Sequence, residues 1–175
     1  MATLALTVSA AGLRAQIPEP PPDKETMPRE VIDGEEVYTL GFQKLAAFEY
    51  VIYDDASGAT PEQIATAKKT DQIPAWVRSY DNQRVALTGY MLPLKVENGL
   101  TAKFIMMRDI STCCFGNIPN MNEYLIVTMT TGGVKPVQDV PTVLIGVFKI
   151  REIYENGYLT SIFQMDGEKF LGVRP

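Results

Sequence analysis

The amino-acid sequence predicts a mainly β domain: a five-stranded, OB-like Greek-key barrel preceded by one helix. After Gln83 the chain shows five stretches with strand periodicity, separated by turn-forming residues. Two of the longer stretches carry an internal glycine, Gly89 and Gly146. A strand that bends from one layer of a barrel into the next needs a bulge or a residue without a Cβ. An open β-sandwich with the same strands is the alternative.

The N-terminal residues are expected to precede the folded body. Residues 1–16 form a short apolar, signal-like segment that ends in Leu13-Arg14-Ala15. Residues 17–35 hold five of the twelve prolines and are expected to form an extended linker. The protein is therefore expected to be periplasmic or otherwise exported. A cytoplasmic location is the alternative, because no lysine or arginine precedes the apolar run.

Residues 36–82 are expected to form helical and extended elements packed on the body. Over 36–53 the apolar period changes from helical to alternating, which predicts a helical turn followed by a strand. Thr60-Pro61-Glu62-Gln63 has the residues of a capping box with proline at the first helical position, so a helix should run to about Thr70. The segment Ala75-Trp76-Val77 should then pack against the body.

Residues 83–175 are expected to form the barrel. The expected strands are 84–91, 101–108, 124–130, 143–154 and 158–164. Asn98-Gly99 and Asn156-Gly157 are expected to form tight hairpin turns, since Asn-Gly readily takes positive φ angles. The last strand is expected to end at Asp166-Gly167. No stretch approaches the roughly 20 apolar residues of a transmembrane helix, so no membrane span is expected.

Composition excludes several classes of function. The 175 residues include 16 basic and 21 acidic side chains, for a net charge of −5, which disfavours a nucleic-acid partner. The sequence has no histidine, so serine and cysteine nucleophiles activated by histidine are excluded, as is zinc held by histidine. These observations favour a protein that is not an enzyme.

Cys113 and Cys114 are the only cysteines and pose a choice between a disulfide, free thiols and a ligand pair. Adjacent Cα atoms lie closer than a relaxed disulfide allows, so a bond between these two would be strained and readily reduced. Thiolates with a nearby thioether suit Cu(I), for which Met121 is the candidate third ligand. Zinc lacks a full ligand set. No cofactor is expected, apart from this metal option.

The loop after the second strand of the barrel is the expected recognition surface, because loops on a rigid barrel commonly carry binding residues. Its amides Asn117 and Asn122 can hold a polar ligand or satisfy backbone groups of the loop itself. Arg108 precedes the cysteines and is the nearest fixed positive charge. The candidate ligand or redox site is therefore Arg108, Cys113, Cys114, Asn117 and Asn122.

Residues 42–170 resemble an uncharacterised bacterial family of small exported or lipoprotein-type proteins. The stretches that carry the resemblance are Phe42-Gln43-Lys44-Leu45-Ala46-Ala47-Phe48-Glu49-Tyr50, Gly89-Tyr90-Met91-Leu92-Pro93-Leu94, Cys113-Cys114-Phe115-Gly116 and the run from Pro119 to Glu123. The resemblance implies an OB-like β-barrel and export. It names no reaction.

The sequence thus favours an exported, non-enzymatic binding or accessory module for a protein or small-molecule partner, brought close to a membrane by export. The alternative is a thiol-based redox or Cu(I)-handling protein that uses Cys113 and Cys114. A second alternative is a binder of single-stranded nucleic acid. The barrel type suggests this last function, while the acidic charge disfavours it.

Overall fold

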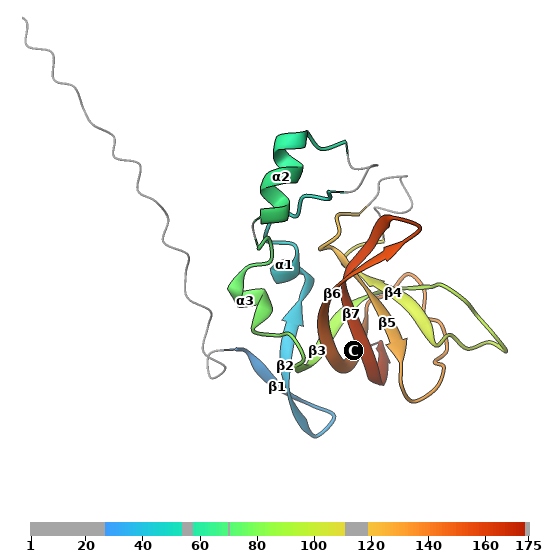
Figure 1. Ribbon diagram of the computed structural model, residues 1–175. Helices are drawn as coiled ribbons and strands as arrows, with labels where there is room; N and C mark the ends of the chain where they lie inside the picture. Colours follow the sequence, from blue (N-terminus) through green and yellow to red (C-terminus); the bar gives the residue numbers. More distant parts are fainter. Residues whose placement is uncertain (1–26, 54–57, 70, 111–118, 174–175) are drawn as a thin grey trace, which may run out of the picture.

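The computed structural model describes residues 27–53, 58–69, 71–110 and 119–173. Within these residues the protein is mainly β, with seven strands in one sheet and three short helices (Figure 1). The signal-like segment, most of the expected linker and both cysteines lie outside the described residues. None of the described helices is long and apolar enough to cross a membrane.

Five of the strands close the predicted barrel. They are β3 (Arg84–Pro93), β4 (Lys103–Met107), β5 (Tyr124–Met129), β6 (Thr142–Glu155) and β7 (Tyr158–Val173). Each pairs with the next in the order β3-β4-β5-β7-β6, and β6 pairs again with β3 to complete a ring. The β5–β7 pairing is parallel and the other four are antiparallel. This is the Greek-key connectivity expected of an OB-like barrel.

Two further strands, which the sequence did not predict, extend the sheet beyond the ring. β1 (Arg29–Ile32) and β2 (Glu35–Gly41) form an antiparallel hairpin, and β2 runs parallel to β3. Their turn is Asp33-Gly34, with φ angles of 53° and 81°. The linker expected over 17–35 therefore gives way to folded structure by Arg29.

The predicted turns and the main predicted helix are confirmed. Asn98 and Gly99 have φ angles of 52° and 78°, and Asn156 and Gly157 have 53° and 88°, as tight hairpin turns require. Helix α2 (Pro61–Lys69) begins with a reciprocal capping box. In it the Thr60 amide donates to Gln63 Oε1 at 2.8 Å, and the Gln63 amide donates to Thr60 Oγ1 at 3.3 Å.

The segment between α1 (Phe42–Leu45) and α2 corrects another expectation. The helical turn is present, but residues 46–53 form no strand. The backbone N–H and C=O of Val51 pair with the Gln72 side chain at 2.8 and 3.1 Å, so they do not join a sheet ladder. Phe48, Tyr50 and Ile52 instead pack sideways against the core. Phe48 makes an edge-on contact with Trp76 of α3 (Ala75–Arg78).

The barrel closes tightly where β6 and β7 each contain a glycine. Gly146 pairs with Gly167, and a register shift lies immediately before Gly146. A Cβ on Gly146 would overlap the Asp166 carbonyl oxygen, and one on Gly167 would lie 2.5 Å from Met129 Sδ. The last strand therefore does not end at Asp166-Gly167 as expected. It continues to Val173, because the missing Cβ atoms let the two strands stay paired.

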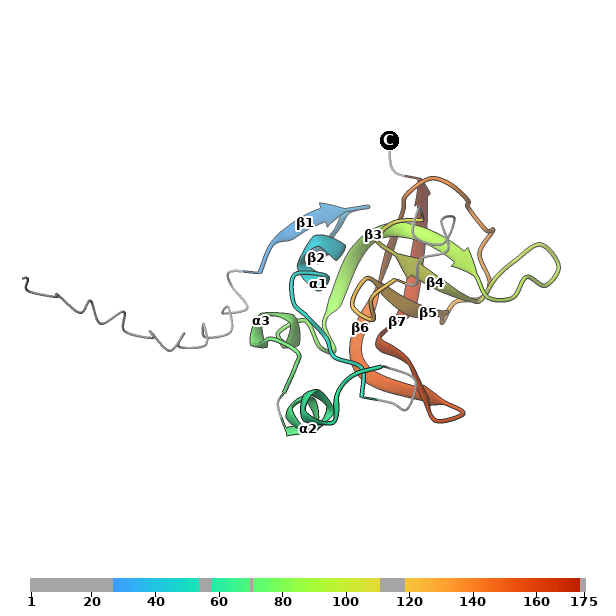
Figure 2. The same cartoon turned by 90° about the horizontal axis from the view of Figure 1, so that it is seen from above.

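Side chains that alternate inward along the ring fill the barrel. Phe104, Phe148 and Phe163 are fully buried there, and the last two rings lie 5.2 Å apart. A second, smaller cluster lies on the outer face, where Ile32 and Val37 of the β1–β2 hairpin cover Ala86 and Ile145. Seen from above, this hairpin and the helices flank one side of the barrel, and the connection between β3 and β4 projects from the opposite side (Figure 2).

Candidate functional site

A groove opens where the β1–β2 hairpin leaves the barrel. Along β3, β6 pairs with residues 84–89, and β2 pairs with residues 85–88 on the other edge. Residues 90–93 of β3 pair with β4 instead. β2 ends at Gly41, which pairs with Thr88, two residues before the pairing of β3 with β4 begins. The chain then continues into α1. A cavity of about 580 Å³ fills the space between these elements, which is within the range of small-molecule sites.

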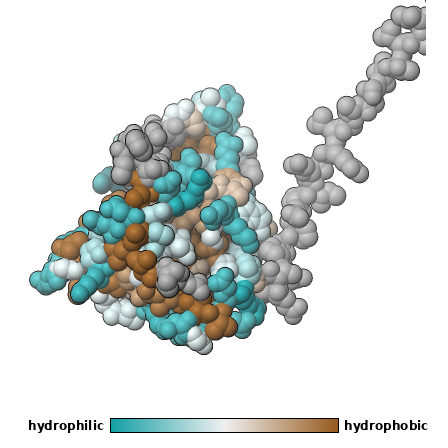
Figure 3. Space-filling view, turned by 180° about the vertical axis from the view of Figure 1, so that it is seen from behind, coloured by the Kyte–Doolittle hydropathy of each residue, from teal (hydrophilic) through white to brown (hydrophobic). Residues whose placement is uncertain are grey.

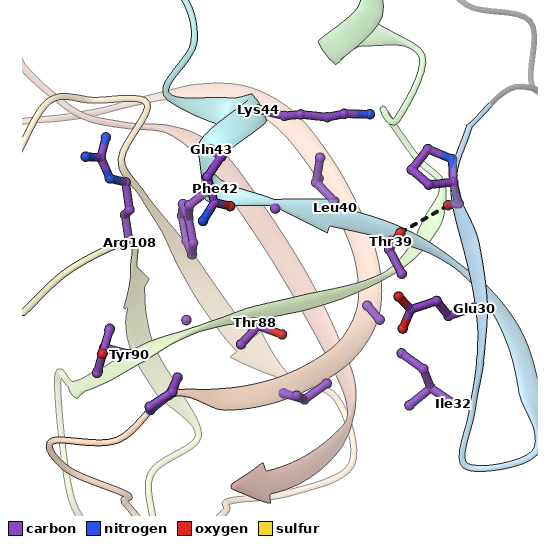
Figure 4. A pocket seen from close by; sticks show the side chains of 16 residues that line it. Glu30, Ile32, Thr39, Leu40, Phe42, Gln43, Lys44, Thr88, Tyr90 and Arg108 are labelled. Carbon is purple, nitrogen blue, oxygen red and sulfur yellow. Dashed lines mark hydrogen bonds between the residues drawn. The ribbon is translucent and has the colours of Figure 1, made fainter. Parts of the chain in front are cut away.

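The groove has an apolar floor and a polar rim. Ile32, Ala86 and Val143 are buried at its floor. The polar side chains around it are Glu30, Thr39, Gln43, Lys44, Thr88, Tyr90 and Arg108. Figure 4 shows Arg108 and Tyr90 at one end, Glu30 beside Ile32 at the other, and Thr88 between them. The groove therefore has Arg108 at one end and Glu30 at the other, and Lys44 adds a second cation on its rim.

Several of these polar groups are left for a ligand. Thr39 Oγ1 donates to the Pro28 carbonyl at 3.3 Å, and Lys44 Nζ reaches the Tyr80 hydroxyl at 3.4 Å. The Gln43 amide and the Thr88 and Tyr90 hydroxyls have no hydrogen-bond partner within the described part of the chain. Gln43 and Thr88 are exposed and Tyr90 is half-buried, so water can satisfy these groups in the free protein. These three can hydrogen-bond to a polar ligand without breaking a described contact.

Among the predicted site residues that the structure describes, Arg108 alone lines this groove. It follows the end of β4, and its Nη1 donates to Glu123 Oε1 at 2.8 Å. Glu123 Oε2 accepts two further bonds from Asn120, at 3.1 and 3.0 Å. The Arg108 side chain remains 49% exposed. The carboxylate thus fixes the guanidinium in place and leaves part of its donor fork available.

The other described candidates already have structural partners. Asn122 is buried, and its Nδ2 donates to the Phe48 carbonyl at 2.5 Å, which ties its loop to the segment after α1. Met121 Sδ accepts a bond from the Tyr124 hydroxyl at 3.0 Å, so this thioether is engaged by a phenol. Cys113, Cys114 and Asn117 lie outside the described residues. Their redox, Cu(I) and recognition roles stay predictions.

The comparisons place this barrel in a family. Residues 18–171 match the model of a family described as a protein of unknown function, DUF3299. The chain belongs to the DUF3299 family. This confirms the resemblance drawn from the sequence. The chain is also similar to a solved DUF3299 family protein from Pseudomonas aeruginosa PAO1, with a TM-score of 0.52 and 17% identity.

That similarity covers 79% of this chain and 97% of the other. At this level of identity it shows the fold alone. No curated protein matches the chain. The function of this DUF3299 protein must therefore be argued from its own surfaces.

Gln43, Thr88 and Tyr90 of the groove were not predicted from the sequence. Thr88 and Tyr90 alternate with the inward-facing Leu87 and Met91 of the same strand, so their outward direction was available from the pattern. The pattern did not show that the β1–β2 hairpin covers this outer face, because the hairpin itself was not predicted. Gln43 comes from α1, a third element.

A second polar cluster, also missed, ties the segment after α1 to β6 of this DUF3299 chain. Glu152 accepts hydrogen bonds from the hydroxyls of Tyr50 at 2.5 Å, Tyr53 at 2.8 Å and Tyr154 at 3.2 Å. We call these four residues the Glu152 cluster. Burial and the hydrogen bond to Glu152 raise the pKa of Tyr50, and burial is also the first cause of the raised pKa values of Tyr53 and Tyr154. The tyrosines therefore stay protonated donors that hold the segment in place.

Proposed function

We propose that the protein is an exported, non-enzymatic binding module. Its groove beside Arg108 takes a short, extended ligand that carries a carboxylate at one end and an amino group at the other. A small zwitterionic peptide has this chemistry. The observation that carries the proposal is that Gln43, Thr88 and Tyr90, which have no hydrogen-bond partner among the described residues, lie between Arg108 and Glu30.

The two charged ends of the groove give the ligand its direction. Arg108 is held by Glu123 and presents the rest of its donor fork, which suits a carboxylate. Glu30, at the other end, suits an ammonium group. The amide of Gln43 both donates and accepts, as do the hydroxyls of Thr88 and Tyr90. They match the alternating N–H and C=O groups of a peptide backbone.

The absence of catalysis is part of the proposal and rests on chemistry. The sequence has no histidine, so the usual proton shuttle near neutral pH is missing. Among the described residues that line the groove, Glu30 is the only carboxylate, so no pair of carboxylates is set up for acid and base roles there. Arg108, the amide and the hydroxyls can bind and orient a ligand.

Export is supported by the signal-like residues 1–16 and the proline-rich stretch that follows them. The location is tested separately from binding, by fractionating cells that express the full chain with a C-terminal tag. Recovery of a shortened chain in the periplasmic fraction supports export, and a full-length chain in the cytosol contradicts it.

The binding proposal is tested by calorimetric titration with trialanine. We expect binding that weakens when the peptide is C-terminally amidated or N-acetylated, because each change removes one terminal charge. Arg108→Ala should weaken binding by about 10- to 100-fold, the range for a hydrogen bond to a charged group. Arg151→Ala is the matched control: its side chain is 54% exposed and faces Asp81, and it does not line the groove.

The control should bind trialanine as the wild type does. Equal loss in both arginine variants would show a general charge effect and contradict the proposed site. So would affinity for the amidated and acetylated peptides equal to that for trialanine.

A further inference from the structure

The connection between β3 and β4 carries an unusual set of exposed aliphatic side chains. Leu92, Leu94, Val96 and Leu100 are 43%, 49%, 51% and 40% exposed. Leu92 lies in β3, Leu94 and Val96 follow at alternate positions in the connection, and Leu100 lies across the turn, where it pairs with Glu97. This connection projects from the barrel in Figure 1, and Figure 3 shows brown, hydrophobic surface on and beside it at the left of that view.

The aliphatic surface continues over the outer face of the barrel. Leu92 pairs with Ile105, and Ile105 pairs with Ile126, so the three side chains form one row across β3, β4 and β5. Ile105 and Ile126 are only half-buried, whereas their neighbours in sequence point inward and are fully buried. A row of aliphatic residues on the outside of a barrel is not needed to fill its core.

Lysines surround this surface. Lys95 and Lys103 flank Leu94, and Lys135 follows Val134, whose backbone pairs with Thr101 of the same connection. Lys95 pairs with Glu97 at 2.8 Å, while no ion pair is found for Lys103 or Lys135 within the described residues. Residues 92–105 and 130–136 thus hold three lysines and one glutamate, a local charge of +2 in a chain whose net charge is −5.

We propose that this surface, formed by Leu92, Leu94, Val96 and Leu100 with Lys95, Lys103 and Lys135, docks on an anionic lipid bilayer. We call it the hairpin surface. Aliphatic side chains that enter the boundary of a bilayer gain hydrophobic free energy. Lysines beside them keep their ammonium groups at the level of the headgroups and attract anionic lipid.

The shape and charge of the surface favour a bilayer over a protein partner. The aliphatic side chains sit on a projecting hairpin and on the outside of the barrel, around a hollow lined by Lys95, Leu100 and Lys103. A deformable bilayer can follow such an uneven surface. The local positive charge complements anionic headgroups, even though the chain as a whole is acidic. The connection between β3 and β4 projects on the side opposite to the β1–β2 hairpin and α1, which form one wall of the groove (Figure 2). The inference does not depend on the ligand of the groove.

The test is co-sedimentation of the full chain with vesicles of phosphatidylcholine alone or mixed equally with phosphatidylglycerol. We expect binding to the mixed vesicles that weakens with added salt. The double variant Leu94→Glu/Val96→Glu should bind at least tenfold more weakly, and Lys95→Glu/Lys103→Glu should lose about fivefold per lysine. Val31→Glu is the matched control, since Val31 is a 71% exposed aliphatic residue on β1.

All variants keep residues 1–16, so the difference between them isolates the hairpin surface from that apolar segment. Circular dichroism and the thermal transition check that each variant folds, and the lysine variants change only exposed side chains. The proposal is overturned if the wild type binds neither vesicle, if it binds both equally, or if the Leu94/Val96 variant sediments as the control does. Self-association that these substitutions abolish, without vesicle binding, would assign the surface to a second copy of the chain and also overturn it.

Discussion

Replacing Gly146 with alanine tests how the barrel closes. Gly146 lies in β6 opposite Gly167 of β7, at a shift in register. A methyl group there would overlap the Asp166 carbonyl oxygen and come within 3.0 Å of Gly167 Cα. Both are backbone atoms of the paired strand, so no side chain can rotate away to make room.

We expect Gly146→Ala to cost about 3 kcal/mol of unfolding free energy, at the upper end of the range for overpacking a core. For a domain of this size, 1 kcal/mol shifts Tm by about 2–4 °C, so the transition should fall by about 6–12 °C. Thermal and urea unfolding followed by circular dichroism measure both quantities.

Gly41→Ala is the control for this prediction. Its new methyl group would meet only Gln43 Oε1, at 3.0 Å, which is the end of an exposed and flexible side chain. Gly41 has a φ angle of −110°, which alanine adopts readily. The control should change stability by less than about 1 kcal/mol. A Gly146→Ala protein as stable as the control would refute the close approach of β6 and β7.

Three further predictions concern other parts of the molecule. The pKa values of the tyrosines in the Glu152 cluster are raised, so these tyrosines stay protonated in the folded state above pH ~10, where unfolded tyrosines ionise. Their contribution to stability is therefore complete below that pH and is lost as the pH rises through the folded-state pKa values. A tyrosinate absorbance titration should show late-titrating groups, and Glu152→Gln should bring them closer to ordinary values. Thr88→Val should weaken trialanine binding about two- to tenfold in calorimetry, with stability unchanged, because its hydroxyl has no partner among the described residues; a loss of stability without a loss of affinity would contradict its role. Thr60→Ala should cost about 1 kcal/mol by removing half of the capping box, seen as faster amide hydrogen exchange confined to α2, and uniform exchange throughout the chain would argue against a local effect.

The barrel was predictable because its signals are local. Asn98-Gly99 and Asn156-Gly157 fix two hairpins through positive φ angles at neighbouring residues. Gly146 marks a register shift between β6 and β7. Asp33-Gly34 is the same kind of signal, but it follows the proline-rich stretch, whose composition led to a linker assignment. The β1–β2 hairpin was therefore missed.

The groove could not be predicted from the sequence. It forms along β3 where the pairing with β2 ends and the pairing with β4 begins, and this depends on the tertiary fold. The sequence indicated Arg108 because it lies near the cysteines. In the structure its side chain bonds to Glu123 and lines the groove. The sequence indicated Asn122 as an amide that could bind a ligand, but its side chain donates a hydrogen bond to the Phe48 carbonyl instead. The Glu152 cluster joins residues about 100 positions apart in sequence, a contact that depends on the tertiary fold.

Mapping the amide resonances of the labelled protein during titration with trialanine tests the proposed binding function most directly. If trialanine binds in the groove, the largest chemical-shift changes fall on residues 41–44 and 86–90 and on Arg108. Changes centred on the β6–β7 hairpin, or none at saturating peptide, would contradict the assignment of the groove as the binding site.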